Sequence, residues 1–388
     1  MAVPNVYTAD EKAMLTDWER AIDKISGWLD EEPRIGKPYP FVHLVATRER
    51  LELSAVGNDY WNPLWRDEDY AKRTRWGGII GHPFFAVYIT FSTPWPDLQV
   101  PPSIGYKAGK VWWEENYFYQ PIKVGDAFRV WVMRPELTDV TNLDGSEPRI
   151  FKLRGAVRIV NQRDETVATR SRTMLITILP SLEGWTPPVV TPSYVYSAED
   201  LDMIRRIEDE EVVRGREIRY WEDVAVGDEV IPTVNGPLTA WDVAMAVASV
   251  GATTIPMREV RRSTPDALIV DPATGVSHKE IEIHFSEKVA RLVTGQPIAP
   301  GFEVMMPRAI TNWMGDDGFF RKLDWRMYGV MELGGTVFAR ARVSRKYEEN
   351  DEKLVDLVSW LETIKGNVAA AGVATVRLVS RTELEIRL

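Results

Sequence analysis

Apolar and polar positions in the first part of the chain follow helical spacing. Residues 8–31 place apolar side chains at intervals of three and four, and a second helix is predicted from Thr47, which can cap it, to about Gly57. Residues 67–73 have the pattern of a short helical turn. Residues 83–92 form an unbroken apolar and aromatic run, which predicts a buried helix.

The pattern then changes to one typical of strands. β-Branched and aromatic residues run or alternate with polar ones, and Gly-Asp, Asp-Gly and Arg-Asp turns separate the stretches. This arrangement predicts an antiparallel meander. Its strands are expected at residues 110–120, 127–137, 151–161 and 166–179.

The second half repeats the order of the first. Residues 181–215 are rich in proline and then highly charged, which predicts a connector on the surface. We therefore predict two domains, residues 1–180 and 216–388, that pack as a pseudo-dimer. In the second, helices are expected at 239–250, 284–292 and 300–313, and strands at 323–330, 336–347, 354–365 and 374–379.

Composition limits the classes of function. A net charge of −10 argues against a nucleic-acid-binding protein, which would carry a basic stripe. No apolar run approaches the ~20 residues that span a bilayer, and the N-terminus lacks the apolar segment of a signal peptide. The absence of cysteine fits a reducing cytoplasm. The four histidines, His43, His82, His278 and His284, lack metal-site spacing, so neither a metal nor a cofactor is expected.

One pair of motifs suggests chemistry. Asp59 and Asn62-Pro63 lie on a loop that leaves the second helix, and Gly81-His82 precede the buried helix. A carboxylate can hold and deprotonate a water molecule, and bare backbone N–H groups at a helix start can bind a carbonyl oxygen. These are the parts needed for adding water to an unsaturated acyl thioester, or for removing it.

The layout resembles the hot-dog fold, and residues 59–71 resemble the signature of the MaoC-like dehydratases, the family of the R-specific enoyl-CoA hydratases. That signature reads Gly-Asp-x-Asn-Pro-aliphatic-His, then five residues, then Ala or Ser. The match is incomplete because one extra residue separates Asp from Asn and Trp65 stands in the place of the histidine. The matching residues are Asp59, Asn62, Pro63, Leu64 and Ala71.

The second half carries the complementary part of the signature. His284 is followed by five residues and Ala290, as in the family, but Lys279 occupies the place of the acid. Glu280 and Glu282 are near enough in sequence to orient His284. The sequence does not decide which half holds the site.

The resemblance implies an α+β double hot-dog protein that acts as a hydratase or dehydratase. Its substrate would be a thioester of coenzyme A or of a carrier protein, and the many tryptophans suggest a bulky acyl group. Asp59 would transfer protons with His82 or His284, and Asn62 would shape the site. Gly81 and Gly301 would bind the thioester oxygen, and Trp65 would contact the substrate. Two arginine- and lysine-containing clusters are candidates for the coenzyme A phosphates: Lys72, Arg73 and Arg75, or Arg258, Arg261 and Arg262.

Each residue also has a purely structural interpretation. Asp59 can cap a helix or close a turn, and Asn62 can close the loop with a hydrogen bond. His82 can be a buried, satisfied histidine, and Gly301 can serve helix packing alone. At the level of the protein, a ligand-binding protein with a degenerate site, a different lyase or cyclase, and a thioesterase remain open, as does a homodimer.

Overall fold

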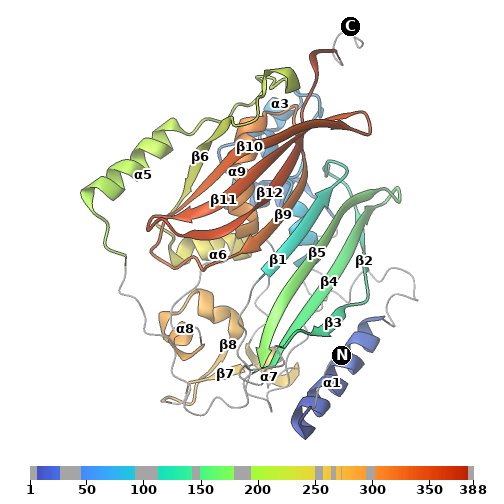
Figure 1. Ribbon diagram of the computed structural model, residues 1–388, viewed down its shortest axis with the longest axis vertical. Coiled ribbons are helices and arrows are strands. Elements are labelled where there is room, and N and C mark those ends of the chain that lie inside the picture. Colours follow the sequence, from blue (N-terminus) through green and yellow to red (C-terminus); the bar gives the residue numbers. More distant parts are fainter. Residues whose placement is uncertain are drawn as a thin grey trace.

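The computed structural model describes residues 7–26, 45–91, 112–141, 149–178, 194–249, 257–263, 268–271, 273–293 and 302–382. Its main feature is one long antiparallel sheet, shown in Figure 1. The strands follow the order β2-β4-β5-β1-β9-β12-β11-β10-β6, and β3 pairs with β4. In these residues no helix is long and apolar enough to cross a membrane.

The first half supplies the strands on one side of this sheet. β4 (Arg149–Asn161) and β5 (Thr166–Ile178) form its longest hairpin, flanked by β2 (Phe128–Val132), β3 (Glu136–Asp139) and β1 (Trp112–Phe118). Its helices are α1 (Ala9–Ser26), α2 (Arg48–Asn58), α3 (Glu68–Ala71) and α4 (Phe85–Phe91), with a 3-10 turn, η1 (Pro63–Trp65).

The second half supplies the other side. Its strands are β9 (Phe319–Met327), β10 (Val337–Glu349), β11 (Glu352–Thr363) and β12 (Val368–Arg377), and β6 (Glu229–Asn235) is the edge strand. β7 (Leu268–Val270) and β8 (Ser277–Lys279) form a separate small ribbon. The helical segments are α5 (Ala198–Glu210), η2 (Trp221–Asp223), α6 (Ala240–Ser249), α7 (Met257–Ser263), η4 (Glu280–His284), α8 (Glu287–Val293) and α9 (Phe302–Met314).

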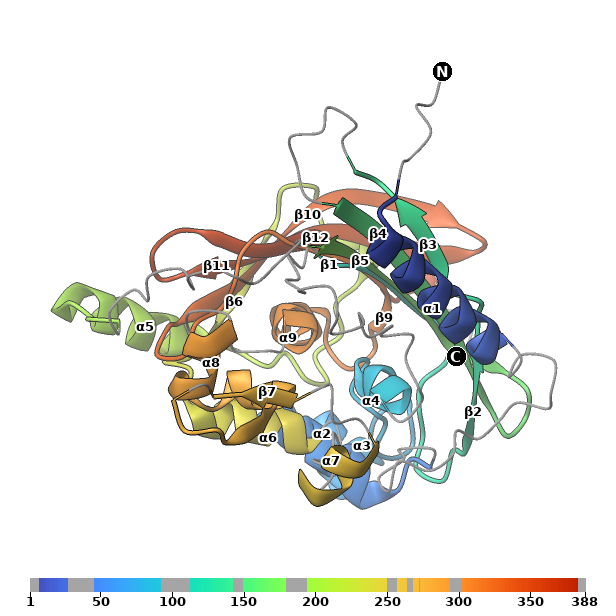
Figure 2. The same ribbon diagram turned by 90° about the horizontal axis from the view of Figure 1, so that it is seen from below.

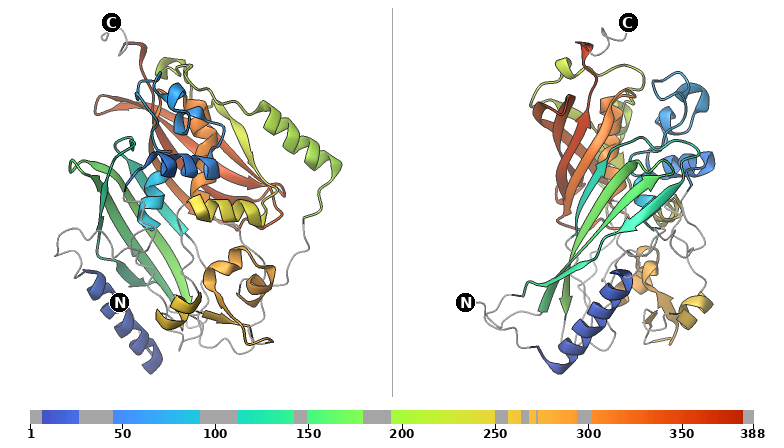
Figure 3. Two further views of the ribbon diagram at one scale, coloured as in Figure 1. Left: turned by 180° about the vertical axis from the view of Figure 1, so that it is seen from behind. Right: turned by 90° about the vertical axis from the view of Figure 1, so that its right-hand side faces the viewer.

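The two halves meet where β1 pairs with β9. From this seam outward the order is β1-β5-β4-β2 on one side and β9-β12-β11-β10 on the other, so the two halves share one strand order. The predicted simple meander is wrong, because the first strand of each half, β1 or β9, pairs with the last one, β5 or β12, and not with the strand that follows it in sequence. Figure 2 shows α4 and α9 next to each other on the concave side of the curved sheet, with α2 and α6 in a layer outside them. The side view in Figure 3 shows the sheet and its covering helices edge-on. This arrangement confirms the expected double hot-dog architecture.

Most predicted elements are found. α1 covers the part of the predicted 8–31 helix up to Ser26, and the rest of that prediction lies outside the described residues. Other predictions are corrected. The single strand expected at 127–137 is two strands, β2 and β3. The 181–215 segment contains a capped helix, α5, and β6 was not predicted. His284 does not begin a helix, because η4 ends there and α8 starts at Glu287.

A buried ion cluster supports the seam. Glu114, which is paired in register with Trp325 across the seam, has no exposed surface. Both its oxygens accept hydrogen bonds from Arg170, at 2.9 and 2.8 Å, and one accepts from Arg172 at 2.6 Å. Burial alone would raise the pKa of Glu114, but the two arginines outweigh it and hold the pKa below its usual value. Arg170 also donates to Thr90 at 2.7 Å, which ties α4 to the sheet.

Replacing Glu114 tests this cluster. Glu114→Gln should lower the free energy of unfolding by about 3–5 kcal/mol, because two buried guanidinium groups lose their counter-charge. Urea unfolding at pH 7 measures the effect. Glu115→Gln is the matched control, since this neighbour is partly exposed and should cost less than about 1 kcal/mol. Equal losses in the two variants would contradict a special role for the buried carboxylate.

Candidate active site

The loop after α2 is shaped by Asn62. Its side-chain oxygen accepts a hydrogen bond from the N–H of Leu64 at 3.1 Å and caps η1, and Pro63 takes the first position of that turn. The resulting bend buries the side chains of Leu64 and Trp65. Asn62 is itself buried and holds the shape of the loop, in agreement with its proposed shaping role.

Asp59 lies at the start of this loop and is buried against two hydrogen-bond donors. Only 2% of its surface is exposed, and its Oδ2 accepts a hydrogen bond from Trp65 Nε1 at 2.8 Å. The hydroxyl of Thr311, on α9 of the second half, approaches the same oxygen at 3.4 Å. Burial raises the pKa of Asp59 to about 6, against the lowering effect of the Trp65 hydrogen bond. A carboxyl with such a pKa can both accept and donate a proton near neutral pH.

His82 is also completely buried, with the opposite electrostatic result. Burial lowers its pKa to about 3, so the imidazole is neutral at physiological pH. Its Nδ1 accepts a hydrogen bond from the N–H of Phe84 at 3.3 Å, which assigns the ring proton to Nε2. Nε2 has no hydrogen-bond partner among the described residues. His82 therefore presents an N–H donor that is available to a ligand.

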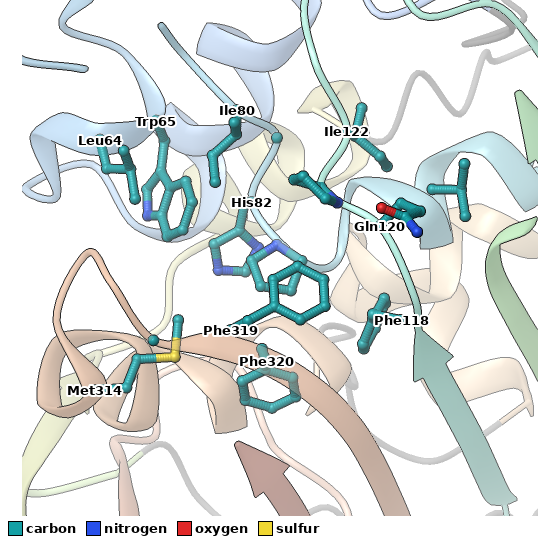
Figure 4. Close-up of a pocket in the computed structure, with 15 residues that line it drawn as sticks. Leu64, Trp65, Ile80, His82, Phe118, Gln120, Ile122, Met314, Phe319 and Phe320 are labelled. Atoms are coloured by element: carbon teal, nitrogen blue, oxygen red, sulfur yellow. The ribbon is translucent and has the colours of Figure 1, made fainter. Parts of the chain in front are cut away.

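That donor belongs to a residue that lines a small cavity, shown in Figure 4. The cavity has a volume of about 30 Å³, enough for a water molecule. Its walls are mainly apolar, and His82 is the only ionisable residue among the described lining residues. Others in the wall are Trp65, Ile80, Phe118, Met314 and Phe320.

Trp65 links the cavity to Asp59. Asp59 is not one of the lining residues, but Trp65 lines the cavity and donates to Asp59. The indole also packs edge-to-face against the His82 ring, with centroids 5.6 Å apart. Trp65 thus occupies the position of the family's histidine and contacts both other candidates. Because an indole N–H can donate but cannot accept, Trp65 itself is not an acid–base group.

The predicted role of Gly81, to bind a carbonyl oxygen, requires a free backbone N–H, and the structure shows this N–H in a hydrogen bond. Its backbone N–H donates to the carbonyl oxygen of Ile122 at 2.8 Å, so this hydrogen is already engaged. A Cβ at this position would lie 3.2 Å from side-chain atoms of both Ile122 and Leu51. Close packing therefore explains the glycine, and His82 Nε2 is the better placed donor for a thioester oxygen.

The described second-half candidates, His284 and Glu282, are not among the residues that line this cavity. His284 ends η4 and is not among the lining residues, and Glu282, a candidate to orient it, contacts His278 instead at 2.9 Å. Gly301 and His43 lie outside the described residues. In the described part of the chain no cluster of three metal-binding side chains occurs.

The two basic clusters differ in surroundings. Arg75 donates to the backbone carbonyl of Asp317 at 3.1 Å and lies over the ring of Trp76, so it joins the first-half loop to the turn after α9. Lys72 pairs with Glu68 at 3.6 Å. Arg258, Arg261 and Arg262 are exposed on α7. Phosphate binding by either cluster stays a prediction.

Sequence reasoning missed the contribution of α9. Thr311 touches Asp59, and the charges of Arg308 and Glu211 act on it. The sequence feature that could have indicated this contribution is Arg308, which lies in a largely apolar helix and therefore needs a partner for its charge. Nothing in the loop sequence around Asp59 points to that helix.

The raised pKa of Asp59 predicts a trade-off between function and stability. The folded protein binds the Asp59 proton more tightly than the unfolded chain does. The contribution of this bound proton to the free energy of unfolding is therefore complete below pH 3.8 and is lost as the pH rises through about 6. The ionised group then costs roughly 3 kcal/mol. Asp59→Asn should raise the free energy of unfolding at pH 8 by up to about 3 kcal/mol and change it little at pH 3.5.

Urea unfolding at both pH values measures this difference. Asp67→Asn is the control, because Asp67 is an exposed helix cap on the same loop and asparagine caps equally well. A destabilised Asp59→Asn variant at pH 8 would contradict a costly buried carboxylate.

Comparison with known proteins extends the picture. Residues 34–170 match the family model described as the FAS1-like, dehydratase domain region, a range that includes Asp59, Trp65 and His82. No match was found among curated protein sequences.

Solved structures share the fold over most of the chain. A MaoC-like dehydratase aligns with 88% of this chain and 96% of its own, at a TM-score of 0.56 and 16% identity. RV0216 from Mycobacterium tuberculosis, described as a conserved hypothetical protein with a double hot-dog fold, aligns over 86% and 93%, at a TM-score of 0.51 and 11% identity. The chain therefore has the double hot-dog fold seen in a MaoC-like dehydratase, its residues 34–170 match the FAS1-like dehydratase region, and the resemblance expected from its sequence is confirmed.

Proposed function

We propose that this protein is a hydratase or dehydratase of acyl thioesters and that its site is built around Asp59, Trp65 and His82. One observation carries the proposal. A carboxyl with a pKa of about 6 and a neutral histidine with an available N–H are joined by one indole beside a water-sized cavity. Such a combination is suited to acid–base chemistry on water next to a polarised carbonyl.

The two groups have different roles in the proposed reaction. In dehydration, the Asp59 carboxylate removes the proton from the α-carbon, and the electron pair moves to the thioester oxygen. His82 Nε2–H donates a hydrogen bond to that oxygen and stabilises its negative charge. As the enolate collapses, the β-hydroxyl leaves and takes the proton from Asp59, so that water and the 2-enoyl thioester are the products. Hydration is the reverse sequence.

Substrate binding must widen the site. The cavity fits water but not an acyl chain, and Asp59 reaches it only through Trp65. We infer that the thioester displaces the Trp65 indole, which exposes Asp59 to the α-carbon. The acyl group, a bulky one included, and the choice between coenzyme A and a carrier protein stay predictions, because the cavity does not select among them.

The reaction is tested with a panel of trans-2-enoyl-CoA and 3-hydroxyacyl-CoA esters, followed by the absorbance of the enoyl thioester. Asp59→Asn should reduce kcat about 10²–10⁴-fold, since it removes the proton-transfer group. Asp67→Asn, at an exposed helix cap on the same loop, is the control for a general disturbance of the loop. An Asp59→Asn variant with full turnover would contradict the assignment.

A second pair of variants separates the donor role of His82 from a role as base. His82→Leu should lower kcat about 10²–10³-fold, the usual cost of one donor to an oxyanion. His82→Gln should keep a substantial part of the activity, because its side-chain amide can donate from a position close to that of Nε2. Equal losses in the two variants would indicate that His82 transfers protons instead.

The position of Trp65 also favours a second candidate, a protein that binds an acyl thioester without turnover. The indole separates Asp59 from the cavity, and no second ionisable residue is found among the described lining residues. Isothermal titration with a non-hydrolysable acyl-CoA analogue distinguishes the two functions. Tight binding with no turnover across the panel would favour the binding protein, and release of free thiol would instead identify a thioesterase.

A further inference from the structure

Helix α9 of the second half passes directly beside Asp59 of the first. Thr311 provides the contact, since its hydroxyl lies 3.4 Å from Asp59 Oδ2 and 3.0 Å from the backbone carbonyl of Arg308. Arg308 is almost one helical turn before Thr311, so both residues lie toward the same side of α9. α9 therefore brings the charged residue Arg308 of the second half close to Asp59 of the first.

Arg308 is held in place by several partners. Its guanidinium forms a two-pronged ion pair with Glu211, with Nε to Oε1 at 3.0 Å and Nη2 to Oε2 at 2.5 Å. It also donates to Asn235 Oδ1 at 3.2 Å and to the carbonyl of Val234 at 3.1 Å, both on β6. Asn312, which follows Thr311 on α9, donates a hydrogen bond to Glu211 at 3.1 Å. Both side chains of the ion pair are largely buried, so solvent screens their charges weakly.

The two charges act on Asp59 in opposite directions. Arg308 favours the ionised carboxylate and lowers its pKa, and Glu211 disfavours it and raises the pKa, on top of the larger effect of burial. The remaining neighbours that act on it, Trp65 and Thr311, are uncharged. His82, beyond the Trp65 indole, is neutral at physiological pH. The two charges that act on Asp59 therefore belong to one ion pair, and their opposing effects add to the larger effects of burial and of the Trp65 hydrogen bond.

We propose that Arg308 and Glu211 are positioning residues of the site, and that this buried ion pair, held beside Asp59 by the Thr311 turn of α9, adjusts the protonation of Asp59. The proposal rests on the assignment of Asp59 as the proton-transfer group. On this proposal both halves of the chain contribute to the site, although the proton-transfer group, Asp59, belongs to the first half.

The test measures the titration of Asp59 without depending on catalysis. The free energy of unfolding is determined from pH 3 to 9 for a given background and for the same background with Asp59→Asn. The difference between the two free energies changes with pH between the pKa of Asp59 in the unfolded chain and its pKa in the folded protein. The upper end of this range, called the midpoint below, reports the pKa of Asp59 in the folded protein and is expected at about 6 in the wild type. The backgrounds are the wild type, Glu211→Gln, Arg308→Gln and the double variant.

The expected shifts have opposite signs. Glu211→Gln should lower the midpoint and Arg308→Gln should raise it, each by about 0.5–1 pH unit, and the double variant should return close to the wild type. A merely structural role would lower stability in every background without moving the midpoint. Unmoved midpoints, or shifts in the same direction, would overturn the proposal. If Arg308→Gln does not fold, Glu211→Gln decides alone, and Arg308→Lys should keep the wild-type midpoint.

A matched ion pair serves as the control. Arg340 and Glu362 lie 2.7 Å apart on β10 and β11, with about a third of each side chain exposed. Arg340→Gln and Glu362→Gln should leave the midpoint unchanged.

The pH dependence of turnover separates this proposal from the proposed function. The limb that reports Asp59 should move with the same signs. If Asp59→Asn abolishes turnover and the midpoints do not move, only the role of the ion pair fails. If the midpoints move while Asp59→Asn retains full turnover, the charge control stands and the proposed catalytic role of Asp59 fails.

Discussion

The pairing of β1 with β9 is the constraint on which the rest of this structure depends. It turns the strands of the two halves into one sheet, and it brings both central helices onto the same concave surface. Together with the hydrogen bond from Arg75 to Asp317, the pairing holds α9 close to the loop after α2, where Thr311 reaches Asp59. The buried carboxylate of Glu114 lies on this seam, where its two arginines connect β1 and β5.

The candidate site combines two groups that burial affects in opposite ways. The same loss of water raises the pKa of Asp59 and lowers that of His82, because in each case it disfavours the charged form. Near neutral pH this leaves one group that exchanges protons and one fixed donor. A fixed neutral donor stabilises developing negative charge without competing for the proton, which suits enolate chemistry. Trp65 and Thr311 donate hydrogen bonds to the Asp59 carboxyl.

Local features of the sequence were sufficient to predict much of this arrangement. Thr47 caps α2 as expected because capping is a contact over three residues, and the buried α4 follows from an uninterrupted apolar run. The loop residues Asp59 and Asn62 were identified by a motif. The edge strand β6 was missed, as its exposed residues and Pro232 weaken the strand pattern.

Features that depend on distant segments could not be predicted. The N–H of Gly81 is engaged by Ile122, forty-one positions further along the chain, which no local pattern reveals. The dependence of Asp59 on Arg308 requires knowing that α9 packs beside α2. Each of these is a tertiary contact between residues whose separation in sequence carries no periodic signal.

The seam also has a consequence for how such a chain can evolve. Five residues of β1, Trp113 to Tyr117, would lose their partners on β9 if the first half existed alone, and such an exposed strand edge is a template for adding another chain. Two copies of one ancestral half could satisfy each other by the same edge-to-edge contact. Fusion of the two copies would then free each half to diverge, so that one could keep the acid while the other kept the helix that supports it.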